Sequence, residues 1–418
     1  MLTQPTRRGV SAPHMLDADT AHTTEPRTPA EWAIWFHTRL MPSWLLRARD
    51  DLHGGFFDQL SEDGIPVADA PKTTLVQARL LFTLSHLYQL KRDPRFLEAA
   101  HQAHAFLSRH LQDAERGGYV YAVNRDGSAM AQPENQIKRS YDQAFVLLAL
   151  VTYGRIVPST QITQQTQACW SFIDTHLTEP ATGALFEDDT GLPPADGTAP
   201  LRAQNPHMHL FEATVQAFEM TGDPVWLQRA GAIRAVVIRH FFDAQTGTIR
   251  EFCGPALLPA TGAAGALREI GHQCEWAWLL HRYARLGGDA SALGMADALM
   301  RFAGRHGFQT QGPMAGAAYD AVYPDGRIMA DTMLLWPQTE AAKAYTARFE
   351  QTGHDDDADR ARSLALLVFQ HYFAGRAAWR NQVDTTGRTL QPDALSRLLY
   401  HVAVFVTEGE RVGLWPTA

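Results

Sequence analysis

The chain has 418 residues, of which 45% are hydrophobic and 20% charged, and its formal net charge at pH 7 is −8. A chain of this length and composition can bury a large core, and its negative charge disfavours nucleic acid and anionic membranes as partners. Its three cysteines, Cys169, Cys253 and Cys274, are far apart and odd in number, which indicates reduced thiols in a cytoplasmic protein.

The first 28 residues are rich in Thr, Pro, Ala and His and lack the apolar core of a signal peptide. We therefore expect a disordered tail over residues 1–28. No later apolar run approaches the roughly 18 residues that a membrane-spanning helix needs.

Six copies of a glycine-containing turn segment divide the rest of the chain. Several end in Asp-Gly or a similar pair, which favours the tight turn of a β-hairpin. They begin about 60 to 70 residues apart, as in a repeat protein, and no linker-like tract interrupts them. We therefore predict a single domain over residues 29–418. The six segments are 54–64, 117–127, 183–191, 247–252, 317–326 and 378–387.

Each repeat contains two predicted helices of different character. The first is amphipathic, with apolar residues at the i, i+3 and i+4 positions, and most copies begin at Asp, Thr or Asp-Pro. The second is in several copies apolar nearly all round, as a helix buried on both sides must be. The first helices span 28–46, 93–111, 163–177, 223–242, 289–307 and 355–373, and the second span 73–88, 141–154, 206–222, 271–287, 333–353 and 395–409.

Six pairs of outer and inner helices predict an all-α fold, namely an (α/α)6 barrel of twelve main helices with short β-hairpins on its rim. An open superhelical solenoid is the alternative arrangement. It is less favoured, because six short repeats without polar caps would expose two apolar ends.

The histidines fall into two groups. Five recur at the ends of the outer helices, where a side chain that can carry a positive charge suits the free carbonyl groups of a helix C-terminus. This recurrence indicates a structural role for His110, His176, His240, His306 and His371. Three others, His209, His272 and His401, break the pattern because they lie near the starts of inner helices. We predict that these three are functional and that His207 is structural.

Polar or aromatic residues mark the first half of every inner helix. Arg79, then Tyr141 with Asp142, and Trp336 with Glu340 occupy the helices that lack such a histidine. Because the inner helices of a closed ring are parallel, these groups should converge at one end. The sequence therefore predicts a polar pocket there.

Pairs of histidine and glutamate indicate the chemistry of this pocket. Glu212 and Glu275 follow His209 and His272 by three residues, which places each pair on one helical face. Such a carboxylate can orient an imidazole and tune its pKa. Two tuned imidazoles suit proton abstraction beside a carbonyl group, and Arg79 would stabilise the resulting enediolate anion.

Other interpretations remain open. Glu212 and Glu275 could be the carboxylate pair of a glycoside hydrolase, an activity that the (α/α)6 architecture also hosts. Zinc held by three histidines is disfavoured, since the close ligand spacing of motifs such as H-E-x-x-H is absent. We therefore expect neither a metal nor another cofactor.

Several blocks of the sequence resemble the N-acylglucosamine 2-epimerase superfamily, which includes mannose isomerases, cellobiose 2-epimerases and other enzymes of free sugars. The blocks are KTTLVQAR, KRSYDQAFVLLAL, NPHMHLFEA, GHQCEWAWLL, WPQTEAAKA and RLLYH, and they follow the family's order between about residues 30 and 410. The resemblance implies an (α/α)6 barrel, no required metal and two histidines that act as acid and base.

The resemblance also implies roles for individual residues. His272 and His401 match the acid–base histidines, and His209 matches a histidine linked to ring opening and to hydroxyl contacts. Leu75 replaces an aromatic residue that is common in the family, which disfavours a disaccharide substrate. The predicted substrate-binding residues are Arg79, Tyr141, Asn205, Glu212, Glu275, Trp336, Trp379 and Arg397.

Within the superfamily, the W-P-Q-x-E-A block most resembles mannose isomerases. We therefore predict an aldose–ketose isomerase that interconverts D-mannose and D-fructose, and related monosaccharides such as D-lyxose, through a cis-enediolate. A sugar 2-epimerase that uses the same residues is the main alternative, and a sugar-binding regulator without turnover is a further one. We expect a cytoplasmic monomer or homodimer whose only partner is a small monosaccharide.

Overall fold

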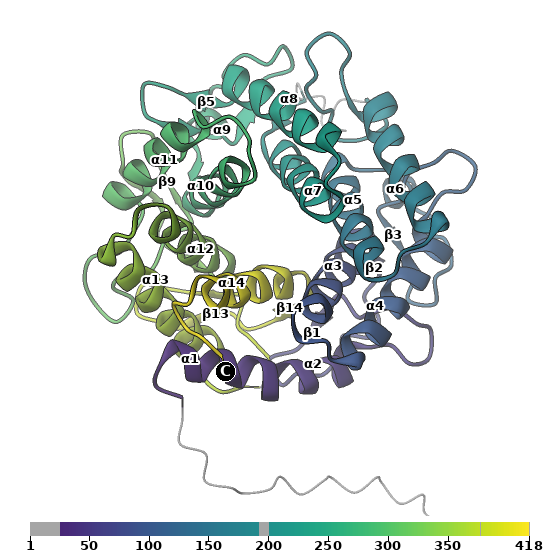
Figure 1. Cartoon of the computed structure of the whole chain (residues 1–418), viewed down its shortest axis with the longest axis horizontal. Helices are drawn as coiled ribbons and strands as arrows, with labels where there is room; N and C mark the ends of the chain where they lie inside the picture. Colours follow the sequence, from purple (N-terminus) through teal and green to yellow (C-terminus); the bar gives the residue numbers. More distant parts are fainter. Residues whose placement is uncertain (1–25, 192–199, 377, 418) are drawn as a thin grey trace, which may run out of the picture.

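The computed structural model describes residues 26–191, 200–376 and 378–417, so the predicted disordered tail lies outside the described residues except for 26–28. Seen down the shortest axis, the chain forms two concentric rings of helices (Figure 1). The described residues contain twelve main helices, six in each ring, if the joined helices at the N-terminus count as one. The prediction of an (α/α)6 barrel is confirmed.

The inner ring consists of helices whose first halves are almost entirely buried. Neighbouring inner helices pack against one another, and the last of them contacts the first. The six helices are α3 (Thr74–Lys91), α5 (Ser140–Ile156), α7 (Asn205–Thr221), α10 (Ile270–Arg285), α12 (Leu335–Thr352) and α14 (Leu399–Val412).

The outer ring covers the apolar faces of the inner helices. Asp93 and Asp223 cap two outer helices, since each carboxylate accepts a hydrogen bond from the backbone two residues later and is followed by proline. The outer helices are α4 (Pro94–Phe106), α6 (Thr160–Phe172), α8 (Pro224–His240), α11 (Ala292–His306) and α13 (Asp355–Leu367), and the first consists of α1 (Pro29–Trp35), η1 (Phe36–Leu40) and α2 (Met41–Ala48).

Several outer helices contain a π-helical segment, which the sequence pattern did not predict. The expected single helix over 28–46 is interrupted by η1, and three others end in such a segment. Those three are η2 (Leu107–Leu111), η4 (Ile173–Leu177) and η5 (Val368–Phe373).

Short antiparallel strands lie where the inner helices begin, and most join the segment before an inner helix to the hairpin of the next repeat. Two of these sheets have two strands: β2 (Lys72–Thr73) pairs with β3 (Ala122–Val123), and β4 (Arg202–Ala203) pairs with β7 (Phe252–Cys253). Two others have three strands: β9 (Ala321–Val322) pairs with both β8 (Arg268–Glu269) and β10 (Ile328–Ala330), and β12 (Gln382–Val383) pairs with both β11 (Met333–Leu334) and β13 (Thr389–Gln391). Strands β5 (Phe242–Asp243) and β6 (Thr248–Ile249) pair within one hairpin. Three short helical segments, η3 (Pro133–Asn135), α9 (Gly262–Ala266) and η6 (Ser396–Leu398), complete the elements.

One strand pair closes the ring. Strand β1 (Gln59–Leu60) of the first repeat pairs with β14 (Ala394–Leu395) of the last, with Gln59 opposite Leu395. The chain therefore returns to its own start, and the open solenoid is excluded.

In four repeats a buried glutamine fixes the hairpin to the inner helix that follows it. In α3, the Gln77 side chain accepts a hydrogen bond from Phe56 N at 3.0 Å and donates one to Phe56 O at 2.8 Å. Gln143, Gln273 and Gln338 make the same pair of bonds to their own hairpins. These bonds satisfy buried backbone groups that would otherwise lack partners. We call this inner-helix position the clamp position.

His207 occupies the clamp position of α7. Its Nε2 accepts a hydrogen bond from Leu185 N at 2.8 Å, and its Nδ1 donates to Ala203 O at 3.0 Å. Burial lowers the pKa of His207 to about 3, so the imidazole stays neutral and can make both bonds. The predicted structural role of His207 is confirmed.

The recurring histidines of the outer helices also contact the hairpins. A Cβ atom added to Gly127 would lie 2.2 Å from His110 Nδ1, and one added to Gly326 would lie 2.1 Å from His306 Nδ1. The φ angles of these glycines are +86° and +88°, a conformation that other residues rarely adopt. The predicted structural role thus holds for His110 and His306, but it rests on packing against a turn.

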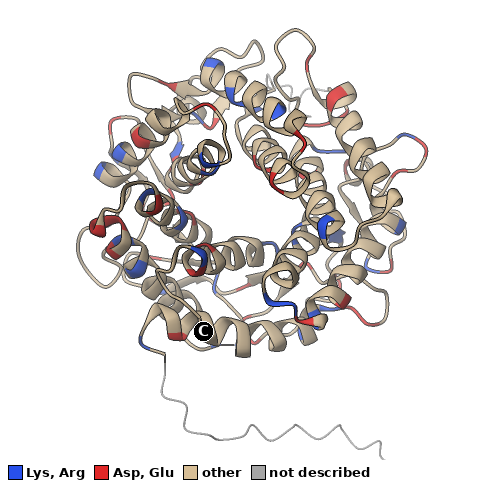
Figure 2. Cartoon of the chain, in the orientation of Figure 1, with Lys and Arg blue, Asp and Glu red and all other residues tan. Residues whose placement is uncertain are grey.

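Charged residues of both signs are distributed around the ring (Figure 2). All three cysteines are buried and free, as predicted for reduced thiols. Among the helices that the structure describes, none combines the length and the hydropathy needed to cross a membrane.

Candidate active site

The inner-helix residues two positions before and two positions after the clamp position form two rings around the barrel axis. In α14 the register follows from Ser396, whose hydroxyl donates to Phe57 O as the hydroxyl of Thr74 donates to Val120 O. Two residues before the clamp position lie Leu75, Tyr141, Asn205, Gly271, Trp336 and Arg397, and two residues after it lie Arg79, Phe145, His209, Glu275, Glu340 and His401. We call them the upper and lower rings.

A cavity of about 370 Å³ is lined by members of both rings. Nine of the eleven predicted site residues line it, because the parallel inner helices bring their first turns together at one end. These nine are Arg79, Tyr141, Asn205, His209, His272, Glu275, Trp336, Arg397 and His401, and the other lining residues are Leu75, Glu269, Leu334, Asn381 and Leu398.

Two of the predicted site residues do not line this cavity. Trp379 is buried in the apolar core, where its ring stacks against Trp44 at a centroid distance of 6.1 Å. The prediction that Trp379 forms a wall of the pocket was therefore wrong, because an aromatic residue in a rim segment can equally face the outer core. Glu212 is also buried and is bonded to neighbouring side chains instead.

His401 is held between a carboxylate and a guanidinium group. Its Nδ1 lies 2.6 Å from Glu340 Oε1, and its Nε2 lies 3.4 Å from Arg79 Nη1. A carboxylate accepts and a guanidinium only donates, so these partners assign the proton to Nδ1 and leave the lone pair on Nε2. Burial lowers the pKa of His401 well below its usual value, and the positive charges of Arg79 and Lys343 lower it further. His401 is therefore a neutral imidazole.

Glu340 connects His401 to a second buried cation. Its Oε2 lies 2.7 Å from Lys343 Nζ, and both side chains are fully buried. Burial and the neighbouring Glu275 raise the pKa of Glu340 well above its usual value. The Lys343 ammonium also lies 3.7 Å from the centroid of the Trp278 ring, which gives it a cation–π contact.

His272 has acidic neighbours instead. Its Nδ1 lies 2.7 Å from Glu251 Oε2 and 3.2 Å from Glu269 Oε2. Burial alone would lower the pKa of His272, but the charges of Glu251 and Glu269 outweigh burial and raise the pKa to about 10. His272 is therefore an imidazolium at neutral pH. The expectation that Glu275 orients this imidazole was wrong, since the carboxylates that bind Nδ1 come from the chain segment before α10.

Trp336 packs against both histidines. The centroid of its ring lies 4.9 Å from that of His272 and 5.8 Å from that of His401. Its indole therefore fixes the positions of two imidazoles that carry different charges.

The third predicted histidine has the neighbour that its spacing predicted. His209 Nδ1 lies 3.0 Å from Glu212 Oε2, and the hydroxyl of Tyr400 donates to Glu212 Oε1. Both oxygens of Glu212 are thus bonded within the protein. Glu212 positions His209 and Tyr400 and is not a group that faces the cavity.

Arg79 lies at the centre of the lower ring. Its guanidinium donates to Tyr141 Oη at 2.7 Å and to Arg397 O at 3.1 Å, besides its contact with His401. Its Cζ lies 4.2 Å from the centroid of the Phe145 ring. These contacts hold a positive charge in one place at the wall of the cavity.

Histidine and carboxylate groups of the site come close enough together to hold a metal ion. The ligand atoms within each of three groups lie within 4.8 Å of one another, namely His209–Glu212–Glu275, Glu251–Glu269–His272 and Glu275–Glu340–His401. In each group, however, the histidine Nδ1 already forms a hydrogen bond with a glutamate of the protein. That the protein acts without a metal stays a prediction.

The carboxylates that control the two acid–base candidates were largely missed from the sequence. Glu251 lies in a hairpin, and Glu269 directly precedes α10. Glu340 was noticed only as a polar residue of its own helix, although its partner His401 lies 61 residues later. The contact between Glu340 and His401 could be predicted once the clamp position of each inner helix is known, because both residues belong to the lower ring.

Comparisons with known proteins agree with this architecture. The family profile described as N-acylglucosamine 2-epimerase (GlcNAc 2-epimerase) matches residues 55–404. A mannose-6-phosphate isomerase from Rhizobium meliloti is 29% identical over 391 residues, which covers 91% of this chain and 96% of that protein. A D-mannose isomerase from Thermobifida fusca is 28% identical over 356 residues, covering 80% and 82% of the two chains. The structure of a cellobiose 2-epimerase from Bacillus thermoamylovorans superposes with a TM-score of 0.81 at 20% identity, covering 91% of this chain and 98% of that one.

Proposed function

The chain belongs to the N-acylglucosamine 2-epimerase family, and we propose that it is an aldose–ketose isomerase that interconverts D-mannose and D-fructose. Membership makes it a sugar isomerase or epimerase. The choice of mannose rests on the relatives of known activity, one of which is a D-mannose isomerase at 28% identity.

The proposal rests on two histidines in one cavity that differ in protonation state. His401 is neutral with its lone pair on Nε2, which faces Arg79, and His272 is an imidazolium held by two carboxylates. Isomerisation needs both a base for carbon and an acid for oxygen, and a base and an acid work best when each is in the correct protonation state.

In this mechanism His401 carries the carbon-bound proton. Its Nε2 takes the proton from C2 of the open-chain aldose, and the electron pair of that bond forms the C1–C2 double bond of the enediolate. The same proton then returns to C1. Arg79, whose guanidinium lies beside Nε2, stabilises the negative charge of the intermediate.

His272 carries the oxygen-bound proton. Its imidazolium donates a proton to O1 as the C1 carbonyl becomes a hydroxyl, and the imidazole then takes the proton from O2 as the C2 carbonyl forms. Each histidine ends the cycle in its starting state, so atoms and charges balance. His209 would contact the sugar hydroxyls and assist ring opening, as the family resemblance implies.

A 2-epimerase uses the same residues but returns the proton to the opposite face of C2. Hydrolysis has less support, since Glu212 does not line the cavity.

The experiment is to incubate the protein separately with mannose, fructose and cellobiose and to identify the products by NMR. The proposal predicts fructose from mannose and mannose from fructose, and no change in cellobiose. Glucose formed from mannose would identify an epimerase, and glucose released from cellobiose would identify a hydrolase. Mannose labelled with deuterium at C2 should give fructose with part of the label at C1, because the proton on His401 exchanges partly with solvent.

A further inference from the structure

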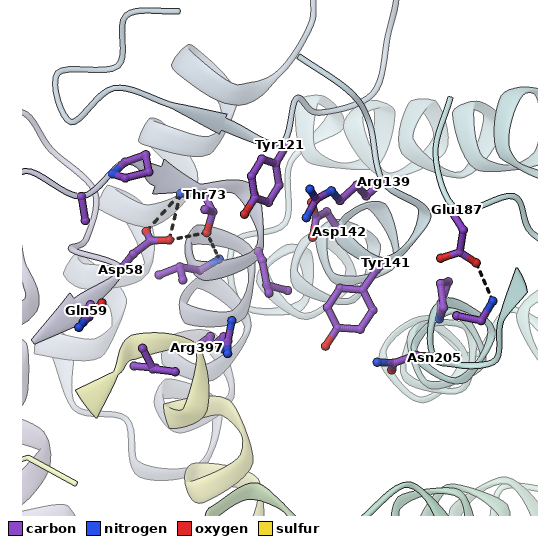
Figure 3. A pocket seen from close by; sticks show the side chains of 17 residues that line it. Asp58, Gln59, Thr73, Tyr121, Arg139, Tyr141, Asp142, Glu187, Asn205 and Arg397 are labelled. Atoms are coloured by element: carbon purple, nitrogen blue, oxygen red, sulfur yellow. Dashed lines mark hydrogen bonds between the residues drawn. The ribbon is translucent and has the colours of Figure 1, made fainter. Parts of the chain in front are cut away.

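A second cavity, of about 540 Å³, adjoins the active site. Leu75, Tyr141, Asn205 and Arg397 line both cavities, so only these side chains separate the two. Figure 3 shows Asp58, Thr73 and Arg397 on one side of the second cavity and Arg139, Tyr141 and Asn205 on the other. We call it the outer cavity. The cavity lined by His272 and His401, where the proposed reaction takes place, is then the inner cavity.

Two arginines of the outer cavity have no anionic partner in direct contact. Among the described residues, the guanidinium groups of Arg139 and Arg397 make no hydrogen bond and no ion pair within the protein, in contrast to Arg79. Arg139 lies with its Cζ 3.7 Å from the centroid of the Tyr121 ring. This stacking fixes the guanidinium plane and leaves its N–H groups free to bind a ligand.

The carboxylates of the outer cavity do not neutralise these arginines by contact. Asp58 accepts hydrogen bonds from Thr73 N at 3.2 Å and from Thr73 Oγ1 at 2.5 Å, and Glu187 accepts one from Ala203 N at 2.6 Å. Asp142 is buried, and burial raises its pKa and that of Asp58 to about 7 each. At neutral pH both aspartates therefore carry only part of their negative charge.

The positive charges in this region also repel one another. Burial lowers the pKa of Arg397, and the nearby charge of Arg79 lowers it further. An anion bound beside Arg397 would relieve that repulsion. A guanidinium group also matches the geometry of phosphate oxygens, which accept two parallel hydrogen bonds from it.

We propose that the outer cavity is a subsite for a phosphate ester on the distal end of the sugar, bound by Arg139 and Arg397. This inference rests on the proposed function, since it assumes that the reacting end of a sugar occupies the inner cavity. A neutral second sugar ring fits less well. Leu75 offers no aromatic surface at the junction, and Arg139 covers one face of Tyr121. Two guanidinium groups that no carboxylate contacts directly would also find no anionic partner in an uncharged ring.

The test measures binding of sugar alcohols, which have no carbonyl group and cannot be isomerised. Affinities for mannitol, mannitol 6-phosphate and cellobiitol are measured by calorimetry in a phosphate-free buffer at fixed ionic strength. We expect mannitol 6-phosphate to bind about tenfold or more tightly than mannitol, as for a hydrogen bond to a charged group. Arg139→Ala should abolish this preference while leaving the mannitol affinity within about twofold.

Arg327→Ala is the matched control. Arg327 lies in an exposed rim hairpin and pairs with Asp325, so its removal changes the net charge equally without touching the outer cavity. The preference for the phosphate should survive in this variant. If it falls as much as in Arg139→Ala, the effect is long-range attraction and the subsite is refuted.

Two further results of the binding measurements would refute the subsite. Equal affinity for mannitol and its phosphate would overturn the inference, as would tighter binding of cellobiitol without any gain from phosphate. The isomerase assay on free mannose is separate. A protein that fails to convert mannose but prefers mannitol 6-phosphate through Arg139 would refute the proposed reaction and retain the subsite.

Discussion

His272 and His401 line the same cavity and contact the same tryptophan, yet their surroundings leave His272 positively charged and His401 neutral. Around His272, two carboxylates contact Nδ1 directly. Around His401, a single carboxylate is paired with Lys343, and Arg79 lies against Nε2. Both histidines are buried, so burial alone does not decide the charge of an imidazole. The number of neighbouring charges and their sign decide it.

The two regions also differ in where their partners come from. His272 is bound by residues of the hairpin and strand that precede its own helix, Glu251 and Glu269. His401 is bound by residues from other inner helices, Glu340 on α12 and Arg79 on α3. The pKa of His272 can therefore be changed from the rim, whereas that of His401 depends on the packing of the inner ring.

Removing either histidine should have the largest effect. We expect His272→Asn and His401→Asn each to fold but to lose about 10²–10⁴-fold in kcat/KM, the usual contribution of a positioned acid or base. Steady-state kinetics with mannose measures this loss, and circular dichroism checks the fold. His110→Asn, at the end of an outer helix, is the control and should retain most activity. Normal turnover in both active-site variants would refute the division of labour.

Arg79→Ala should come next in size. It removes the fixed charge beside His401 Nε2, and an interaction that stabilises an oxyanion is typically worth about 10²–10³-fold in kcat. The loss should appear in kcat more than in KM. Thermal unfolding of the same variant separates this effect from a structural one. A fall in melting temperature with kcat preserved would show that Arg79 serves the core through Tyr141 instead.

Glu251→Gln should change the region around His272 without touching His401. Glu251 raises the pKa of His272, so its neutralisation lowers that pKa and the imidazolium loses its proton at lower pH. The alkaline limb of the pH profile of kcat/KM should therefore move to lower pH, by about one to three pH units. The acidic limb should stay in place. Movement of the acidic limb would mean that His272 is not the acid.

Lys343→Met should produce the smallest shift in the pH profile, in the direction opposite to that of Glu251→Gln. Lys343 lowers the pKa of His401, so its removal raises that pKa and His401 is protonated at higher pH. The acidic limb should then move to higher pH, by about one pH unit, while the alkaline limb stays.

The control for this change is Lys91→Met, which removes a lysine that pairs with Glu410 away from the cavity. It should leave both limbs in place. A loss of stability in Lys343→Met without any movement of the acidic limb would show that Lys343 is only structural.

The fold could be predicted from the sequence because each repeat carries its own local signals. Glycines at the turns and the apolar character of the inner helices recur along the chain, and Asp-Pro marks the starts of two outer helices. The clamp residues, such as Gln77 and Gln143, recur too, but their spacing gains meaning only when the hairpin contacts are known. The π-helical segments have no comparable signal, since they keep the helical apolar pattern.

The site could be predicted in part. His209, His272 and His401 stood out because each breaks the pattern of an apolar helix. Spacing along a helix correctly paired His209 with Glu212, whereas it wrongly paired His272 with Glu275. In that second case the chain before α10 brings two nearer carboxylates to Nδ1. Contacts that cross between repeats leave no trace in local spacing, and such contacts set the charge of both histidines.

The central claim is that His272 is charged and His401 neutral in the resting protein, and ¹⁵N NMR of labelled histidine tests it directly. The His272→Asn and His401→Asn variants assign the two sets of signals. At pH 7 we expect His272 to show protons on both ring nitrogens and to keep them until about pH 10, as its pKa predicts. His401 should show a proton on Nδ1 only. A neutral His272 or a doubly protonated His401 at pH 7 would contradict the account.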